Sequence, residues 1–252
     1  MLETVLAPNA SPLTLDGTRT FIIGRSVRAV VDPGSAEPGH LGAIAETVGE
    51  ARVEAVLVTH RHPDHRSGAD ELAERFACPV RAQYRGTLSD GATTPTDAGP
   101  LVAVATPGHT PDHFAFHWPR EAVVFCGDLM MGGQDTALVA LPEGRLGPYL
   151  ASLQRVRRLR PRIIYPAHGP AFRNPEQALD RYVRHREVRL EQVIRALSAG
   201  PRGYDGLRRA VYGAQLDPAL EPAATAALKA YLEHLQGLGR VRRAGRDWEL
   251  VT

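Results

Sequence analysis

Cysteine, lysine and long apolar runs are scarce in this sequence of 252 residues. The two cysteines, Cys78 and Cys126, are too few for a disulfide framework or a thiolate zinc site, and they suggest a reducing compartment. No run of 18 apolar residues exists, and the first residues lack the basic start and apolar core of a signal peptide. We therefore expect a cytoplasmic protein without a membrane partner.

Lysine occurs once, at Lys229, so arginine supplies nearly all of the 30 basic residues, which we attribute to codon usage. The charge is divided unevenly along the chain. Residues 1–180 hold 17 basic and 20 acidic residues, a net charge of −3, whereas residues 181–252 hold 13 and 8, a net charge of +5. The basic character of this otherwise ordinary globular composition therefore lies at the C-terminal end.

Short apolar runs alternate with helical patterns over the first 170 residues. Residues 84–100 are rich in Gly, Thr, Asp and Pro, which is typical of a loop or an edge hairpin. This order predicts an α+β protein whose sheets are covered by helices. The predicted strands are 21–23, 27–31, 53–58, 101–105, 113–117, 122–126 and 163–165, and the predicted helices are 39–48, 68–76 and 147–159.

The pattern becomes helical after Asn174-Pro175, a pair that predicts the start of a helix of about 24 residues. Two more helices are predicted over 206–212 and 222–238, and residues 241–243 can pair with 247–251 as a hairpin. Three helices and a hairpin are typical of a winged-helix domain.

The segment His60-Arg61-His62-Pro63-Asp64-His65 carries the strongest chemical signal. Three imidazoles and a carboxylate are costly to leave unpaired in a core, and a metal ion is their natural common partner. These donors suit zinc, and also iron or manganese. Further polar residues follow later predicted strands, each beside a glycine that lets the backbone approach an ion closely: His109, Asp128 and His168.

The HRHPDH segment, Gly108-His109-Thr110, Gly127-Asp128 and His168-Gly169 together resemble the metallo-β-lactamase superfamily. The resemblance covers about residues 18–170 and implies an αββα sandwich, in which two sheets are flanked by helices. It also implies two zinc ions with a hydroxide held between them, and Asp64 and Asp128 as catalytic residues. In the family's pattern the first metal is bound by His60, His62 and His109, the second by Asp64, His65 and His168, and Asp128 bridges the two.

Four further residues are candidates for supporting the ligands or contacting the substrate. Asp32, at the end of a predicted strand, resembles an acid of the superfamily that orients ligands from behind; capping a turn is its alternative role. Thr110, Asp112 and His113 follow His109 closely. For Asp112 and His113 the alternatives are an acid, a substrate contact, support of the ligands or simple strand polarity.

The segment that begins at Tyr182, with the winged-helix pattern, resembles the β-lactamase-like-protein-2 group of the superfamily, whose characterised animal member cleaves single-stranded RNA. The leading hypothesis is therefore a phosphodiesterase or endoribonuclease acting on single-stranded RNA. Similar domain pairs occur in polyketide-releasing thioesterases, so a small-molecule ester or thioester hydrolase resembling glyoxalase II is the alternative. The resemblance implies a hydrolase domain at 1–173, a connecting helix at 174–199 and a winged-helix-like domain at 200–252.

Arginines on the predicted hairpin are candidates for contacts with a nucleic-acid backbone: Arg240, Arg242, Arg243 and Arg246. Alternatively, the hairpin only packs against the rest of the protein, forms a wall of the active site or forms the contact of a homodimer. The exposed side of the predicted helix 222–238 has mixed charge, so we do not expect sequence-specific DNA binding. A mononuclear iron oxidoreductase and a pure nucleic-acid-binding module are further hypotheses, and the complete ligand set argues against the second.

Overall fold

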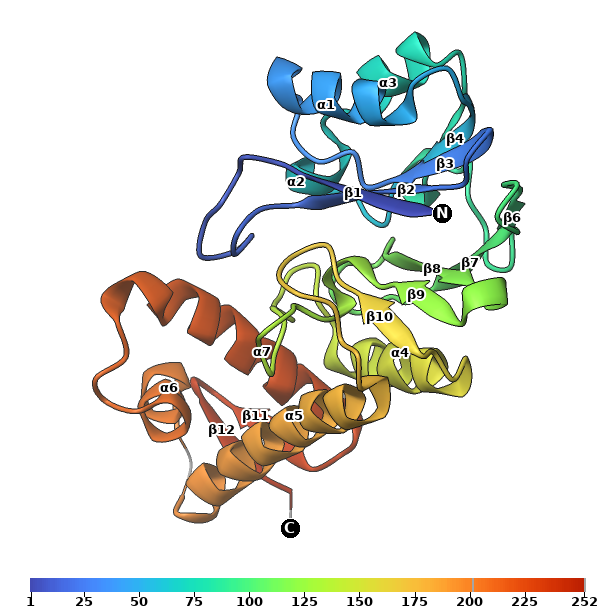
Figure 1. Ribbon diagram of the computed structural model, residues 1–252. Helices are drawn as coiled ribbons and strands as arrows, with labels where there is room; N and C mark the ends of the chain where they lie inside the picture. The colour runs from blue at the N-terminus through green and yellow to red at the C-terminus, as the bar shows by residue number, and fades with distance from the viewer. Residues whose placement is uncertain (201, 252) are drawn as a thin grey trace.

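Two five-stranded sheets lie at the centre of the computed structural model, which describes residues 1–200 and 202–251 (Figure 1). The order of the first sheet is β1 (Leu2–Leu6), β2 (Arg19–Ile23), β3 (Val27–Val31), β4 (Arg52–Leu57) and β5 (Val80–Arg81). The order of the second is β10 (Ile163–Tyr165), β9 (Val123–Phe125), β8 (Phe114–Trp118), β7 (Leu101–Ala105) and β6 (Thr93–Thr94).

Strand direction brings the C-terminal ends of several strands to common edges. β3 and β4 are parallel, so their ends share one edge of the first sheet. In the second sheet β9 and β10 are parallel, and β7 runs the same way because both β7 and β9 pair antiparallel with β8. The loops that follow β7, β9 and β10 therefore leave the second sheet on the same side.

Alternation of side chains along the strands builds an αββα sandwich. Phe21 and Ile23 face the second sheet and pack with Phe116 and Phe125, whereas Ile22 faces the helices on the outer side. The first sheet is covered by α1 (Pro38–Val48) and α3 (Ala69–Arg75), and the second by α4 (Leu146–Arg158) and α5 (Pro175–Ser198) (Figure 1). The predicted α+β sandwich is confirmed.

The predicted helices and strands agree with the observed ones within about two residues, but the described strands β1 and β5, the helix α2 (Pro63–Arg66) and the short 3-10 turns were not predicted. β1 is an edge strand with a partly exposed pattern, so its sequence shows no clean alternation. β5 has two residues, and α2 is a single turn inside the histidine-rich segment. Each is held by tertiary packing rather than by a local pattern.

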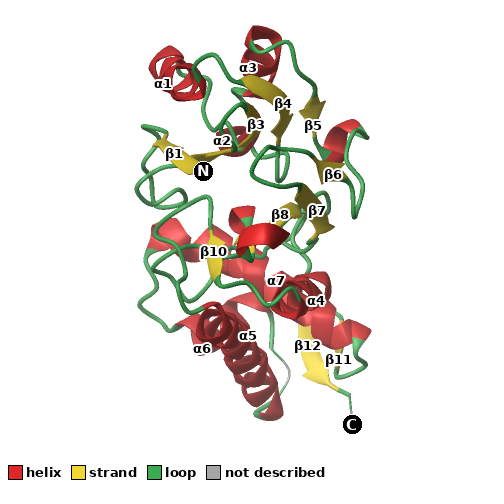
Figure 2. Ribbon diagram, turned by 45° about the vertical axis from the view of Figure 1, so that its right-hand side comes forward, coloured by secondary structure: helices red, strands yellow, loops and turns green. Residues whose placement is uncertain are grey.

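The C-terminal part contains α6 (Tyr204–Tyr212), α7 (Glu221–Gly237) and a hairpin of β11 (Val241–Ala244) and β12 (Asp247–Leu250) (Figure 2). Its buried side chains join those of the second sheet, α4 and α5 in a single apolar cluster. The winged-helix identification and the boundaries at 173 and 200 stay predictions. Among the described helices, none combines the length and the apolar character that crossing a bilayer requires.

We expect Leu228→Ala to lower the free energy of unfolding by about 2–5 kcal/mol, because Leu228 on α7 is fully buried in this shared cluster and its loss leaves a cavity. Urea denaturation followed by circular dichroism measures the change. Leu238→Ala is the matched control, since Leu238 is 60% exposed just after the same helix, and it should cost less than about 0.5 kcal/mol. Equal effects of the two substitutions would contradict the shared core.

Candidate metal centre

Seven histidine and aspartate side chains converge where strand ends of the two sheets meet. The segment that holds His60 to His65 follows β4, and His109 follows β7. Asp128 lies in a short 3-10 turn, η3 (Gly127–Leu129), after β9, and His168 follows β10. The ligand atoms fall into one group of His60, His62, His109 and Asp128 and another of Asp64, His65 and His168.

The ligand atoms of the first group lie close together. The Nδ1 atom of His62 lies 2.9 Å from Nε2 of His60 and 3.1 Å from Nε2 of His109. The Oδ2 atom of Asp128 lies 3.5 Å from Nε2 of His109 and 4.0 Å from Nε2 of His60. Four donor atoms on four side chains therefore face a common point.

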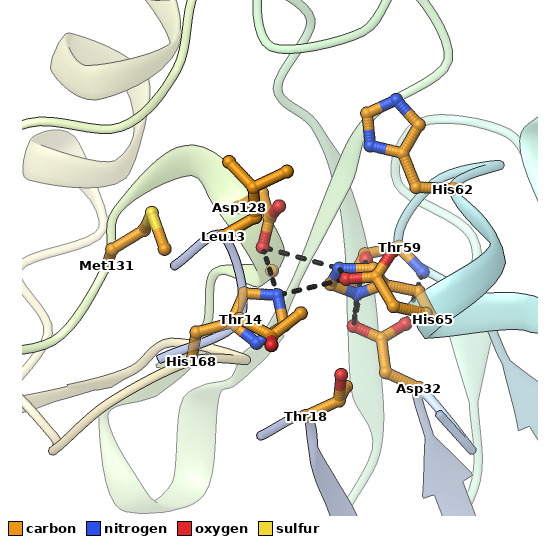
Figure 3. Close-up of polar contacts among 12 residues, drawn as sticks. Leu13, Thr14, Thr18, Asp32, Thr59, His62, His65, Asp128, Met131 and His168 are labelled. Carbon is orange, nitrogen blue, oxygen red and sulfur yellow. Dashed lines mark hydrogen bonds and ion pairs between the residues drawn. The ribbon is translucent and has the colours of Figure 1, made fainter. Parts of the chain in front are cut away.

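The second group uses the other oxygen of Asp128. Its Oδ1 atom lies 3.3 Å from Nε2 of both His65 and His168 (Figure 3). The Oδ2 atom of Asp64 lies 3.4 Å from Nε2 of His65 and 3.3 Å from Nε2 of His168. The two oxygens of the Asp128 carboxylate thus face the two groups separately, as a bridging ligand requires.

Three atoms of the second group are buried without a hydrogen-bond partner: Nε2 of His65, Nε2 of His168 and Oδ1 of Asp128. Buried polar atoms are nearly always paired, so three such atoms that face one another call for a shared partner. Imidazole nitrogens and carboxylate oxygens are ligands of zinc, iron and manganese. The residues present therefore fit a bound cation.

The other ring nitrogen of three candidate ligands is also held, which fixes the orientation of each imidazole. His109 Nδ1 lies 2.8 Å from the carbonyl oxygen of Leu138, and His168 Nδ1 lies 3.2 Å from that of Gly17. His65 Nδ1 lies 3.0 Å from Oδ2 of Asp32. In each case the contact turns Nε2 toward the centre.

Asp32 lies behind the ligands, as a supporting acid would. Its carboxylate accepts hydrogen bonds of 2.8 Å from both the backbone N–H and the hydroxyl of Thr59. Its backbone has φ +50°, an uncommon conformation for a residue with a side chain. The parallel pairing of β3 and β4 places Asp32 beside Thr59, and Thr59 was not singled out in the sequence.

Thr110, Asp112 and His113 are all buried. The Nε2 atom of His113 accepts a hydrogen bond of 3.1 Å from the backbone N–H of Asp128, and its Nδ1 lies 2.8 Å from the hydroxyl of Thr106. Asp112 accepts a 2.9 Å hydrogen bond from the backbone N–H of Arg61. His113 and Asp112 therefore contact the backbone of ligand-bearing segments, and the hydroxyl of Thr110 has no partner among the described residues.

Glu143 is a site residue that sequence reasoning missed. Its two carboxylate oxygens lie 3.0 Å from Nε2 of His62 and 3.0 Å from a guanidinium nitrogen of Arg61. It lies in the loop before α4, 81 residues from His62, and no local pattern marks it. Only the tertiary structure brings this carboxylate to the rim of the centre.

The hairpin arginines lie away from the centre. Arg240, Arg242, Arg243 and Arg246 are exposed, and Arg242 pairs with Glu249 on the facing strand. Both ribbon views place the hairpin at the far end of the molecule from α2, with α7 between them (Figures 1 and 2). The structure does not bring these four side chains to the seven candidate ligands.

The Metallo-beta-lactamase superfamily model matches residues 14–86 and 84–168. The chain belongs to this superfamily. The predicted family is thereby confirmed, and the architecture of the metallo-beta-lactamase fold accounts for the meeting of strand ends described above.

Relatives within the superfamily differ in their named activities. A "Beta-lactamase-like protein 2 homolog" of Caenorhabditis elegans is 30% identical over 77% of this chain and 70% of its own length. An "Atrochrysone carboxyl ACP thioesterase" of Aspergillus fumigatus is 29% identical over 93% of this chain and 61% of its own length. The crystal structure of a metallo-beta-lactamase family protein from Thermus thermophilus matches over 99% of this chain and 98% of that one, with a TM-score of 0.78 and 22% identity.

In the metal-free centre, His65 and His168 hold protons, whereas His60 and His109 do not. Burial favours the neutral imidazole, but the carboxylates of Asp128 and Asp64, each 3.3 Å from its Nε2 atom, raise the pKa of His168 to about 9. Burial acts on His65 in the same way, but the carboxylates of Asp128 and Asp32 raise its pKa well above the usual value. Burial lowers the pKa of His60 and of His109, so these imidazoles are neutral near pH 7.

We expect the metal-free protein to lose stability as the pH rises from about 6.5 to about 9, by on the order of 2–3 kcal/mol. In this window the folded chain keeps the proton of His168 that the unfolded chain releases, so deprotonation favours unfolding. His60 and His109 have lowered pKa values and titrate below the window. Urea denaturation in the presence of a chelator measures the slope, and His168→Gln should reduce it. A stability that rises with pH would contradict the charge assignment.

Gly127 carries the backbone close to the side chains that position Asp128. It has φ +49°, and a Cβ atom there would lie 2.8 Å from Nε2 of His113 and 2.8 Å from the hydroxyl of Thr59. These distances are shorter than real Cβ contacts, so a side chain would push the neighbours away.

We expect Gly127→Ala to destabilise the metal-free protein by about 1–3 kcal/mol more than Gly86→Ala, because it adds overpacking to the backbone strain. Gly86 is a matched control, since it has φ +68° and open space where a methyl group would lie. Chemical denaturation of both variants gives the comparison. If the two variants are equally stable, the close approach at Gly127 is absent in solution.

Proposed function

We propose that this chain is a hydrolase that uses two metal ions, one held by His60, His62, His109 and Asp128 and the other by Asp64, His65, His168 and Asp128. The division of the Asp128 oxygens between the two groups supports this assignment. Two bound metal ions would supply Lewis-acid activation of water and of the substrate's reacting oxygen. Zinc is the metal we propose, and the same donors suit iron or manganese.

Asp64 is the residue that we assign to orienting the attacking water. Burial would raise the pKa of its carboxyl, but the adjacent imidazoles of His168 and His65 hold that pKa far below its usual range. The side chain keeps 28% of its surface exposed and lines the cavity above the centre. Asp64 therefore remains a carboxylate that accepts a hydrogen bond from water without storing the proton.

We infer the class of substrate from the residues that line the cavity above the centre. It has a volume of about 260 Å³, and none of the described residues that line it is arginine or lysine. A phosphodiester backbone is normally met by basic side chains, whereas a neutral acyl group needs apolar walls. The apolar lining consists of Leu13, Pro63, Met131, Ala137 and Leu138.

We therefore infer that a small-molecule thioester or ester is the substrate, and the similarity to a protein named as an acyl-carrier thioesterase supports this. Hydrolysis would form a bond between the oxygen of the water oriented by Asp64 and the carbonyl carbon, and would break the bond from that carbon to sulfur in a thioester or to oxygen in an ester. The proton that the water loses goes to the leaving thiolate or alkoxide, so the products are a carboxylic acid and a thiol or an alcohol.

Single-stranded RNA cleavage is the second candidate. The four exposed arginines of the hairpin favour it, because they give the C-terminal end a basic surface. The similarity to a beta-lactamase-like protein 2 homolog also supports it. An RNA strand bound at the hairpin would have to extend around α7 to reach the centre (Figure 1).

The deciding experiment compares three substrates on the zinc-loaded protein: S-octanoyl-N-acetylcysteamine, bis(p-nitrophenyl) phosphate and a labelled single-stranded RNA. We expect the thioester to be cleaved with the highest kcat/KM. We expect about two zinc ions per chain by elemental analysis, and a loss of thioester turnover of about 100-fold or more in Asp64→Asn, equivalent to ~3 kcal/mol.

Asp70→Asn serves as the control variant, because Asp70 is an exposed carboxylate on α3 that pairs with Arg85 away from the centre. It should retain the turnover of the unsubstituted protein. Circular dichroism checks that Asp64→Asn is folded. If the unsubstituted protein cleaves RNA but not the thioester, and RNA cleavage disappears in Asp64→Asn, the nuclease proposal replaces the acyl one. Full activity in Asp64→Asn on every substrate would exclude the proposed centre.

A further inference from the structure

A second cavity adjoins the one above the metal centre, and we call it the helix chamber. It has a volume of about 400 Å³ and lies between the loop of residues 131–139 and side chains of α5, α6 and α7. Four residues line both cavities: Leu13, Met131, Ala137 and Leu138. Leu13 and Met131 lie beside Asp128 in the close-up of the centre (Figure 3). The two cavities are therefore direct neighbours that share these four residues as lining.

The helix chamber combines apolar walls with basic groups. Alanines of α7 and leucines around it form much of the surface, among them Ala223, Ala224 and Ala227. Three basic residues of α5 also line it: His185, Arg186 and Arg189. None of the described lining residues is aspartate or glutamate. The chamber is thus suited to an apolar arm and has an unbalanced positive charge.

Arg186 is a buried cation without a counter-ion. The residue is 3% exposed. Its guanidinium donates to the hydroxyl of Tyr231 at 2.9 Å and to the carbonyl oxygen of Ala137. Its Nε atom has no partner, and no carboxylate of the described residues pairs with it. The ring of Tyr149 lies beneath the guanidinium, with its centroid 5.0 Å from the guanidinium carbon. These partners are all neutral, whereas buried charges in proteins are usually paired with an opposite charge.

Arg189 lies one turn further along α5 and is partly exposed. It donates to the carbonyl oxygen of Val211 at 2.7 Å and to Oε1 of Gln192 at 3.0 Å, and it lies over the ring of Tyr212. It forms no ion pair with any described carboxylate. Burial and the two arginines also lower the pKa of His185 to about 4, so this imidazole adds a neutral, hydrogen-bonding group near pH 7.

We propose that the helix chamber binds an apolar arm of the substrate that ends in an anionic group, with Arg186 and Arg189 as its counter-ions. The proposal rests on the proposed function in one respect, since the arm is part of the molecule cleaved at the metal centre. The anionic group is either a carboxylate at the far end of the acyl chain or the phosphate of a phosphopantetheine thiol. Both offer oxygens to a guanidinium.

Binding to the metal-free protein tests the chamber independently of catalysis. We expect octanoate to bind more tightly than 1-octanol by calorimetry, and Arg189→Gln to weaken octanoate by about tenfold or more, about 1.4 kcal/mol, while octanol changes less than about twofold. Arg184→Gln is the matched control on the same helix, because Arg184 is exposed and does not line the chamber. It should change neither affinity, and Arg189→Lys should recover part of the octanoate affinity.

A second variant keeps the test decisive if Arg189→Gln unfolds. Ala223→Phe fills the chamber without changing its charge, so it should weaken octanoate and octanol alike. Ala219→Phe, at an exposed position just before α7 that does not line the chamber, is its control and should weaken neither. If Ala223→Phe leaves both affinities unchanged, octanoate binds elsewhere and the proposal is overturned.

Turnover of paired thioesters then identifies the source of the anion. One pair has octanoyl and 7-carboxyheptanoyl groups on N-acetylcysteamine, and the other has an octanoyl group on pantetheine and on phosphopantetheine. Arg189→Gln should lower kcat/KM selectively for the charged member of one pair. Unchanged ratios in both pairs, with unchanged octanoate affinity, would overturn the chamber while thioester hydrolysis stands. Arginine-dependent octanoate binding without thioester turnover would support the chamber and reject the proposed reaction.

Discussion

The rest of the site depends on the contacts that the Asp128 carboxylate makes with the surrounding imidazoles. Its two oxygens face two sets of imidazoles, so its position decides whether both sets can share one charge. That position comes from the end of β9, from the tight backbone at Gly127 and from the hydrogen bond that His113 accepts. The sandwich therefore serves to bring one acidic group to the meeting point of several strand ends.

Burial makes this arrangement electrostatically demanding. His65, His168 and Asp128 are almost inaccessible to solvent, so a charge on any of them must be balanced by its neighbours. Without metal, protons on His65 and His168 supply the balance, and a bound cation would take over the same role. The second nitrogens are held by Asp32 and by backbone carbonyls, so either state leaves the rings in place.

Much of the centre was predictable, because the candidate ligands follow strands that can be recognised in the sequence as short apolar runs. His109, Asp128 and His168 are examples, and parallel strand direction explains why they meet. Glu143 and Arg186 were not predictable, since their contacts join segments far apart in sequence and no local pattern marks them. The exposed hairpin arginines stood out in composition, yet their distance from the centre depends on how the hairpin packs against α5 and α7.

The loop of residues 131–139 is held from two sides at consecutive peptide groups. Arg186 on α5 donates to the carbonyl oxygen of Ala137, and His109 contacts the carbonyl oxygen of Leu138. The loop that lines both cavities thus also holds a candidate metal ligand in place. A substitution on α5 that displaces Arg186 would therefore move the peptide group directly next to the one that orients His109.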